Sequence, residues 1–395
     1  MGKSQQHYGI QVEIARNQND LRYMITENGI PIQDPCLWLD LVSMNSYLTG
    51  ERYAYALLRY FRYLRANGLH YYEVTNKRVI EEYIKDLLGL GDKVINFEGQ
   101  MTFKALSTYI TVLKSFYHWL EDERKVTMNP VLYSSKRTKQ APLVNTKLLY
   151  GQIWNFDIDE TVLSRVKYQK KRNHLKWYTE QEITAICKEF RTLRDKTVFT
   201  ISVETGMRIG ELLGLKLDQF DPFEPSLDIV REQNIENRAR AKTTERKLYI
   251  YTHLAEMIQT YITTERAEAD ILGYDYLFLN NQGKYKGSPL KTRNFLRILK
   301  GAGERAGLVK SEIRTHSGRS TRAQQLVELM RENPELRITK TFIDEEMGWR
   351  SERSIKPYEK GYSMTQKRKI MERIKPVIAS ITGHLTKGDK IHDKD

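Results

Sequence analysis

Cysteine and long apolar runs are both scarce in this chain. Its 395 residues include two cysteines, Cys36 and Cys187, which are too few and too far apart for a disulfide framework or a zinc site. No segment approaches the roughly 18 consecutive apolar residues needed to cross a bilayer, and the N-terminal residues lack the apolar core of a signal peptide. The sequence therefore predicts a cytoplasmic protein that uses no metal and does not enter a membrane.

Acidic residues are in the minority. Lysine and arginine number 64 against 50 aspartates and glutamates, which gives a formal charge of +14. A surface of that sign attracts polyanions, so nucleic acid is the first candidate partner, although a merely soluble basic protein has the same balance. The length exceeds the ~100 to 200 residues that one domain usually organises, and we therefore expect two or three domains.

The first 33 residues are expected to form a small β extension. Residues 10–14 and 21–25 alternate apolar and polar side chains, as strands with one buried face do. The Glu-Asn-Gly sequence at 27–29 is a turn signal. We interpret these strands as a cover on the domain that follows.

Helical periodicity takes over in residues 34–130, where three apolar helix faces predict a small bundle. Thr75 is placed to cap the second of these helices. The bundle ends by Met128–Pro130, because the residue before a proline avoids helical backbone. The apolar faces comprise Tyr53, Leu57, Phe61 and Leu64, then Val79, Ile80, Tyr83, Ile84 and Leu87, then Leu106, Tyr109, Ile110, Leu113, Phe116, Tyr117 and Leu120.

Two basic stretches are candidate DNA contacts. Arg52, Arg59 and Arg62 lie on the polar face of the first helix, where they either line a DNA backbone or form an ordinary solvated face. Residues 131–172 are expected to be an interdomain linker. Its end is basic and includes Lys170, Lys171 and Arg172, which either lie against phosphates or are simply solvated.

A second domain is expected over residues 173–375, followed by a C-terminal helix or tail over 376–395. It opens with a capping box, Thr179 followed three residues later by Glu182. Strand-like segments at 226–232 and 246–251 stand among helical patterns. The predicted fold class is mainly α with a small antiparallel sheet in the second domain, an α+β organisation.

The last part of this domain contains residues suited to cleaving a phosphodiester. Such a reaction needs a nucleophile in line with the leaving oxygen and donors for the non-bridging oxygens. Tyr358 is the candidate nucleophile, because a covalent phosphotyrosine conserves the bond energy for religation. Arg208 and Arg319 can each offer paired donors to a phosphate.

Further residues complete this chemistry. His316 precedes Arg319 by three residues, so both lie on one face of a helix start. Lys242 occupies a turn-like segment before a strand, a position suited to protonating a departing hydroxyl. Trp349 can donate its indole N–H, and Glu211 can orient Arg208. Taken singly, each residue is more typical of packing or of a solvated surface, and only their joint order favours a catalytic role.

In that order, these residues resemble the tyrosine recombinase (phage integrase) family. The "ETGMRIGELLGLKLDQFD" segment is similar to the family's first arginine box, and "HSGR" to its His-x-x-Arg box. Trp349 and Tyr358 stand nine apart as in the final box, and Lys242 lies six residues before Leu248 as the family's hairpin lysine does. The similarity spans residues 173–375, preceded by a helical bundle like the family's core-binding domain.

The resemblance implies a site-specific DNA recombinase. Two domains would form a C-shaped clamp on double-stranded DNA, and a homotetramer would pair two sites and exchange strands through a 3′-phosphotyrosine and a Holliday junction, with no metal, ATP or other cofactor. An accessory DNA-bending or directionality protein would be a further partner, and the enzyme would work at the bacterial nucleoid. The N-terminal extension and long catalytic segments favour an integrase or transposase of a mobile element over a chromosome-dimer resolvase.

Several alternatives stay open. Trp349 stands where most members of the family have histidine, Lys247 is the reserve for the lysine, and Tyr362 is a second nucleophile candidate. The C-terminal helix would dock on a neighbouring protomer or on its own, and the N-terminal extension would cover the bundle or bind accessory DNA sites. A type IB topoisomerase uses similar residues, and a catalytically silent DNA-binding protein would keep the fold.

Overall fold

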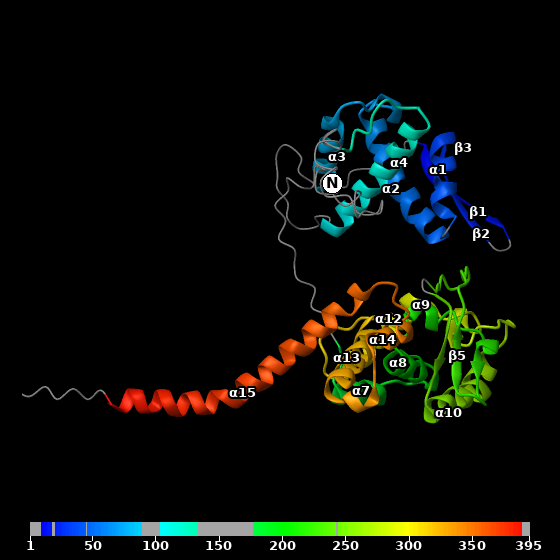
Figure 1. The fold of residues 1–395 in the computed structure, drawn as a ribbon. Coiled ribbons are helices and arrows are strands. Elements are labelled where there is room, and N and C mark those ends of the chain that lie inside the picture. The colour runs from blue at the N-terminus through cyan, green and yellow to red at the C-terminus, as the bar shows by residue number, and fades with distance from the viewer. Residues whose placement is uncertain are drawn as a thin grey trace, which may run out of the picture. The chain divides into compact units, whose positions relative to one another are not determined.

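The computed structural model describes residues 9–17, 20–44, 46–88, 103–132, 177–241 and 244–388. The chain divides into two compact units, residues 1–172 and 173–395 (Figure 1). Nearly all of the linker expected over 131–172, including Lys170, Lys171 and Arg172, lies outside the described residues, as does Lys242.

The first unit opens with the predicted β element. Strands β1 (Ile10–Asn17), β2 (Asp20–Glu27) and β3 (Ile30–Pro31) form an antiparallel sheet in that order. The sheet packs on the next helices, since Tyr23 and Ile25 are buried. It covers the bundle, as the alternation of apolar residues predicted.

In the described part of this unit, the bundle is formed by four helices: α1 (Gln33–Ser43), α2 (Tyr47–Ala66), α3 (Lys77–Leu88) and α4 (Phe103–Asp122). A single turn, η1 (Tyr71–Glu73), follows α2. The core is aromatic: the Trp38 and Phe61 rings each meet the Phe116 ring edge-on, and the Tyr60 and Tyr117 hydroxyls lie 2.8 Å apart. These are the three predicted apolar faces, with α1 as an additional helix.

The predicted cap of α3 is wrong by one residue. The helix begins at Lys77, and the Oδ1 of Asn76 accepts the backbone N–H of Arg78 at 2.9 Å. Asparagine at this position satisfies an N–H that would otherwise lack a partner in the first turn. Thr75 therefore lies one residue before the cap.

The second unit is mostly helical, and α8 runs through its interior (Figure 1). This helix contacts α7, α9, α10, α12 and α13. The helices of the unit are α7 (Glu180–Lys188), α8 (Leu193–Thr205), α9 (Ile209–Leu212), α10 (Thr252–Tyr261), α11 (Ala267–Ala269), α12 (Thr292–Arg305), α13 (Ser317–Glu332), α14 (Lys340–Glu346) and α15 (Lys356–Gly388). Short turns are η4 (Leu217–Gln219), the π-type η5 (Ile262–Arg266), η6 (Gly283–Tyr285), η7 (Pro334–Leu336) and η8 (Glu352–Ser354). The capping box predicted at Thr179 and Glu182 opens α7.

A small antiparallel sheet completes the unit. Its strands are β4 (Phe220–Asp221), β5 (Ser226–Ile229) and β6 (Arg246–Tyr249), in that order. The two longer strands were predicted with wider bounds, and β4 was not predicted. Leu227 pairs with Leu248 and Ile229 with Arg246, which puts these four side chains on the face turned to the core.

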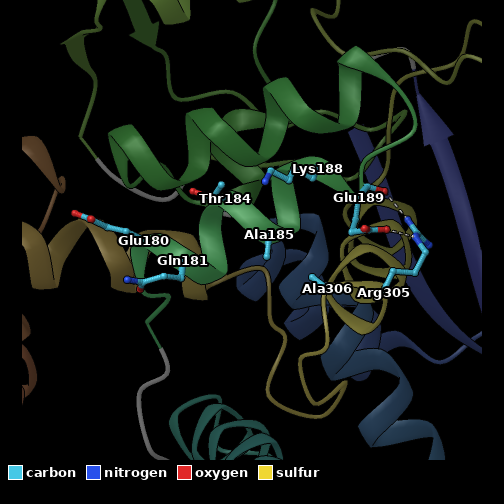
Figure 2. A pocket seen from close by; sticks show the side chains of 8 residues that line it. All are labelled: Glu180, Gln181, Thr184, Ala185, Lys188, Glu189, Arg305 and Ala306. Carbon is cyan, nitrogen blue, oxygen red and sulfur yellow. Dashed lines mark hydrogen bonds and ion pairs between the residues drawn. The ribbon is translucent and has the colours of Figure 1, made fainter.

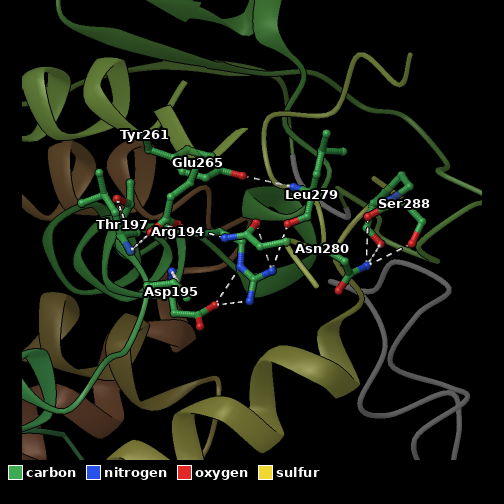
Figure 3. Close-up of polar contacts among 12 residues, drawn as sticks. Arg194, Asp195, Thr197, Tyr261, Glu265, Leu279, Asn280 and Ser288 are labelled. Atoms are coloured by element: carbon green, nitrogen blue, oxygen red, sulfur yellow. Dashed lines mark hydrogen bonds and ion pairs between the residues drawn. The ribbon is translucent and has the colours of Figure 1, made fainter. Parts of the chain in front are cut away.

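A buried polar network ties the beginning of α8 to the rest of the unit (Figure 3). The Arg194 guanidinium donates to Asp195 Oδ1 at 2.6 and 2.8 Å and to the Leu279 carbonyl at 3.0 Å. The Glu265 carboxylate, from η5, accepts the backbone N–H groups of Leu193 and Arg194 at 2.7 and 2.9 Å. Each of these charged side chains therefore has hydrogen-bond partners, as groups removed from water require.

The last helix, α15, is continuous from residue 356 to 388 and extends away from the body of its unit (Figure 1). It therefore crosses residue 376, where a separate C-terminal element was expected to begin. Ile370, Ile374 and Ile378, on the predicted apolar face, are exposed. Across the described parts of the chain, every helix is too short or too polar to traverse a lipid bilayer.

Candidate active site

Arg208 is fixed by a reciprocal contact at the start of α9. Helix α8 ends at Gly206, whose φ of +67° reverses the chain. Arg208 then takes the N-cap position, with its backbone N–H donating to Glu211 Oε2 at 3.1 Å and its Nη1 donating to Oε1 at 3.0 Å. The first arginine box is thus a helix cap in which one carboxylate holds both the main chain and the side chain of the arginine.

Glu211 also receives a second arginine. Its side chain is 0% exposed, and Arg246 Nη2 donates to its Oε2 at 3.1 Å. A carboxylate without access to water needs charged or hydrogen-bonded partners. Glu211 is therefore the point where α9 and β6 are joined.

Arg319 lies at the centre of the site. It is 1% exposed in the first turn of α13, where its Nη1 donates to the Gly206 carbonyl at 2.8 Å and its Nη2 to the Met347 carbonyl. The pKa of Arg319 is lowered to about 9, first by burial and then by the positive charge of Arg208, while the carboxylate of Glu211 opposes the shift. Arg319 thus interacts with two further arginines, Arg208 and Arg246, and with the Glu211 carboxylate.

The close approach of α13 to α8 places Arg319 at the centre of the site. Gly318 packs on α8, where a Cβ atom would fall 2.2 Å from the Ser202 Oγ. Only glycine admits this separation. The "HSGR" segment thus provides a contact between helices through Gly318 as well as the hydrogen-bond donors of Arg319.

His316 precedes α13 and is exposed, although its ring is partly surrounded by protein. The pKa of His316 is lowered from its ordinary value, first because burial disfavours the charged ring and then because Arg319 and Arg208 repel a third positive charge. The neutral ring can donate one hydrogen bond and accept another.

Trp349 and Tyr358 form an aromatic pair beside Arg319. Their rings stack with centroids 5.6 Å apart and planes 18° apart, and the Arg319 guanidinium lies 5.7 Å from the Trp349 ring centroid. Tyr358, in the first turn of α15, is 4% exposed. The aromatic pair brings the candidate nucleophile next to the buried cation.

The structure therefore brings together Arg208, Glu211, His316, Arg319, Trp349 and Tyr358. The reserve lysine, Lys247, points to the other face of β6 and donates to the exposed Glu224 at 3.3 Å. Tyr362 lies one turn after Tyr358, where it is partly buried against the apolar cluster that includes Met347 and Tyr358.

The arginines of α2 differ in their surroundings. Arg52 is exposed and donates to the Thr108 hydroxyl, and exposed Arg59 lies 5.6 Å from the Tyr109 ring centroid. Arg62 is half buried and donates to the Ile10 carbonyl at 3.0 Å. Arg62 therefore attaches the β extension to the bundle rather than standing in solvent as the sequence predicted.

Sequence reasoning missed Arg246. The cations that the sequence analysis selects in this part of the chain are Lys242 and Lys247. The strand pattern contains the signal: Leu248 is apolar and inward, so the residue two positions earlier also faces inward. A charged residue on the buried face of a strand requires a partner, which here is Glu211.

A surface hollow of about 590 Å³ lies apart from this site, between α7 and α12 (Figure 2). The Arg305 guanidinium crosses to the Glu189 carboxylate at 3.1 Å and to the Glu189 carbonyl at 2.7 Å. None of its lining residues belongs to the cluster around Arg319.

The sequence has relatives among known proteins. Residues 176–362 match the model of the phage integrase family. The chain is 23% identical over 288 residues to transposase A from transposon Tn554 of Staphylococcus aureus, covering 71% of this chain and 74% of that protein. It is also 23% identical over 268 residues to tyrosine recombinase XerC of Bacillus pumilus, covering 66% and 72%.

Solved structures share the fold. The Tn1549 transposon integrase in complex with transposon right end DNA superposes with a TM-score of 0.55 and 16% identity, over 87% of this chain and 99% of that one. The XerH site-specific recombinase bound to palindromic difH substrate gives a TM-score of 0.54 and 15% identity, over 82% and 80%.

Proposed function

The chain belongs to the phage integrase family of tyrosine recombinases, and from this premise we propose that it is the site-specific recombinase of a mobile element, an integrase or transposase. One observation carries the proposal most directly. A buried arginine with a lowered pKa, Arg319, lies beside a second arginine and against the Trp349–Tyr358 stack. This arrangement suits an anion with several oxygens next to a nucleophile.

The bound anion is proposed to be a phosphodiester of duplex DNA. Arg208 and Arg319 would donate to its non-bridging oxygens, with Trp349 contributing its indole N–H. Glu211 keeps Arg208 oriented before the substrate arrives, so little reorganisation is needed when charge develops.

Tyr358 would then attack phosphorus. Its oxygen forms the new P–O bond, the bond to the 5′ oxygen breaks, and the products are a 3′-phosphotyrosine and a 5′-hydroxyl. Lys242, carried over from the family resemblance, would supply the proton to the leaving oxygen, and neutral His316 would accept the proton of the tyrosine. Attack by the 5′-hydroxyl of a partner strand reverses the step and leaves a Holliday junction, with no need for ATP.

Exchange between two DNA sites requires more than one protomer. We propose a homotetramer on paired sites, as the family resemblance implies, with an accessory DNA-bending or directionality protein as a further partner. The phosphate backbone would be approached by Arg52 and Arg59 on α2 and by Lys170, Lys171 and Arg172.

A covalent adduct tests the reaction class. Overlapping nicked duplexes, tiled across the DNA that flanks the coding locus, are incubated with the full chain and with Tyr358→Phe and separated on a denaturing gel. A nick beside the cleavage point lets the leaving strand diffuse away, so the adduct accumulates. We expect an adduct from wild type and none from the variant, with equal DNA binding.

The other outcomes identify the alternatives. An adduct that persists in Tyr358→Phe would make Tyr362 the nucleophile. Binding with no adduct from either protein would favour a silent DNA-binding protein. An adduct together with relaxation of supercoiled plasmid, but with no joining of two sites, would favour a topoisomerase.

A further inference from the structure

Arg246 joins three parts of the candidate active site that are far apart in the sequence. It stands at the beginning of β6, its side chain is 9% exposed, and it pairs with Glu211 of α9 at 3.1 Å. Its Nε donates to the Glu346 carbonyl at the end of α14, also at 3.1 Å. One guanidinium thus bridges β6, α9 and the turn that leads to Trp349.

The turn after α14 is organised around two arginines. Arg246 donates a hydrogen bond to the carbonyl of Glu346, and Arg319 donates one to the carbonyl of the next residue, Met347. Gly348 follows with a φ of +55°, and a Cβ at that position would lie 2.7 Å from the Arg246 Nη1. Trp349 comes directly after, so its backbone is set by a turn that these two arginines hold.

Charge explains why an arginine is needed at this point. Glu211 is inaccessible to water and already binds Arg208, and a buried carboxylate of this kind is costly unless positively charged partners compensate it. A planar guanidinium can donate in two directions at once, whereas an ammonium is a single point charge. Arg246 uses one nitrogen for the carboxylate and another for the Glu346 carbonyl.

We propose that Arg246 is a positioning residue for strand cleavage: through Glu211 it fixes Arg208, and through the Glu346 carbonyl it fixes the turn that carries Trp349. The inference rests on the proposed function. Arg246 itself is buried and would not touch the DNA. Its role is to make the two phosphate-binding arginines and the aromatic pair meet at one place.

The test compares single-turnover adduct formation by the full chain and its variants on a saturating nicked duplex from the flanking DNA. Arg246→Lys keeps the charge but loses one of the two directed donors. We expect the cleavage rate per bound complex to fall by roughly 100-fold, as small displacements of catalytic groups do, while the DNA dissociation constant stays unchanged.

Arg266→Lys is the matched control. Arg266 lies in the same unit with a side chain 5% exposed, against 9% for Arg246, and it donates to the Tyr276 and Tyr274 carbonyls and to Asp270. Its replacement is expected to lower the melting temperature without slowing cleavage by the folded, bound protein. A purely structural role for Arg246 would give the same result as this control, and would overturn the inference.

A double-mutant cycle identifies the route. If Arg246 acts through Glu211, then Arg246→Lys combined with Glu211→Gln cleaves no more slowly than the slower single variant. Rate losses that multiply would refute this route. Should Arg246→Lys not fold, Gly348→Ala keeps the arginine but displaces its guanidinium, and is expected to slow cleavage in the same way.

Wild type and Tyr358→Phe accompany every measurement. Absence of an adduct from wild type would refute the proposed function itself. An adduct from wild type with an equal rate from Arg246→Lys would refute only the positioning role.

Discussion

At the scale of single residues, one carboxylate organises the cations of the site. Glu211 binds the main chain and side chain of Arg208 and the side chain of Arg246. Arg319 is held instead by two carbonyls, from Gly206 and Met347. Carbonyl dipoles orient a guanidinium without cancelling its charge, so Arg319 keeps its attraction for an incoming anion.

His316 gives a prediction for stability against pH. Its folded-state pKa is lowered below the ordinary value of 6.5, so near and below that value the unfolded chain binds the proton more readily than the folded one. The contribution of this residue therefore lowers stability as pH falls through 6.5 and vanishes above it. We expect wild type to lose more unfolding free energy than His316→Gln between about pH 7.5 and 5.5.

Urea unfolding at the two pH values measures this difference, with His253→Gln as a control that removes an exposed histidine from the same unit. An equal loss in wild type and in His316→Gln would show that neither burial nor the surrounding arginines lower the pKa of the His316 ring in the folded protein.

At the scale of elements, the site depends on how closely α13 approaches α8. A Cβ at Gly318 would lie 2.2 Å from the Ser202 Oγ and 3.1 Å from the Ser202 Cβ. Gly318→Ala is therefore expected to destabilise the protein by about 1–3 kcal/mol, as overpacking does, and to slow cleavage because Arg319 is the next residue. Thermal unfolding and adduct formation measure the two effects.

Two companion variants sharpen this prediction. Ser202→Ala removes the nearest atom and should recover part of the stability lost in Gly318→Ala. Gly301→Ala lies within α12, where the new Cβ would meet the flexible Arg305 Nη1 at 3.4 Å, and should stabilise the fold by ~0.5–1 kcal/mol. Similar losses at Gly318 and Gly301 would indicate a general intolerance rather than a close helix contact.

Most elements were predictable because periodicity is local. The capping box at Thr179, the apolar face of α4 and the strands around Leu227 and Leu248 follow from neighbouring residues. Errors arose where two local signals competed. Thr75 and Asn76 are both good caps, and only the path of the chain selects Asn76.

At the scale of the whole molecule, the charge of +14 predicts strong dependence of DNA binding on salt. If six or more phosphates are contacted, the affinity should fall roughly a thousandfold or more between about 50 and 200 mM salt. Binding measured across this range tests the prediction, and an affinity that hardly changes would contradict a backbone-binding protein.

Arg59 and Arg62 provide an internal comparison for that measurement. Arg59 is exposed, so Arg59→Ala should reduce the salt slope by about 1 if the residue contacts a phosphate. Arg62 is engaged with the Ile10 carbonyl, so Arg62→Ala should lower the melting temperature and leave the slope unchanged. The reverse result would show that Arg62 leaves the β extension to reach DNA.

The sequence by itself determined which residues could perform the chemistry. Arg208, His316, Arg319, Trp349 and Tyr358 occur in an order and spacing that indicated phosphodiester cleavage, and helix and strand periodicities indicated the elements that carry them. Each of these motifs and periodicities lies within a short stretch of sequence and can be recognised without knowledge of the fold.

Only the tertiary structure decided how those residues are held. The contact between Arg246 and Glu211, and the two carbonyls that hold Arg319, join residues from 28 to 113 positions apart. No periodicity encodes such pairs, because they form when α8, α9, β6, α13 and the turn before Trp349 pack around one buried charge. The position of Arg246 inside that cluster is a consequence of packing, and it gives the strand a role that its sequence alone did not reveal.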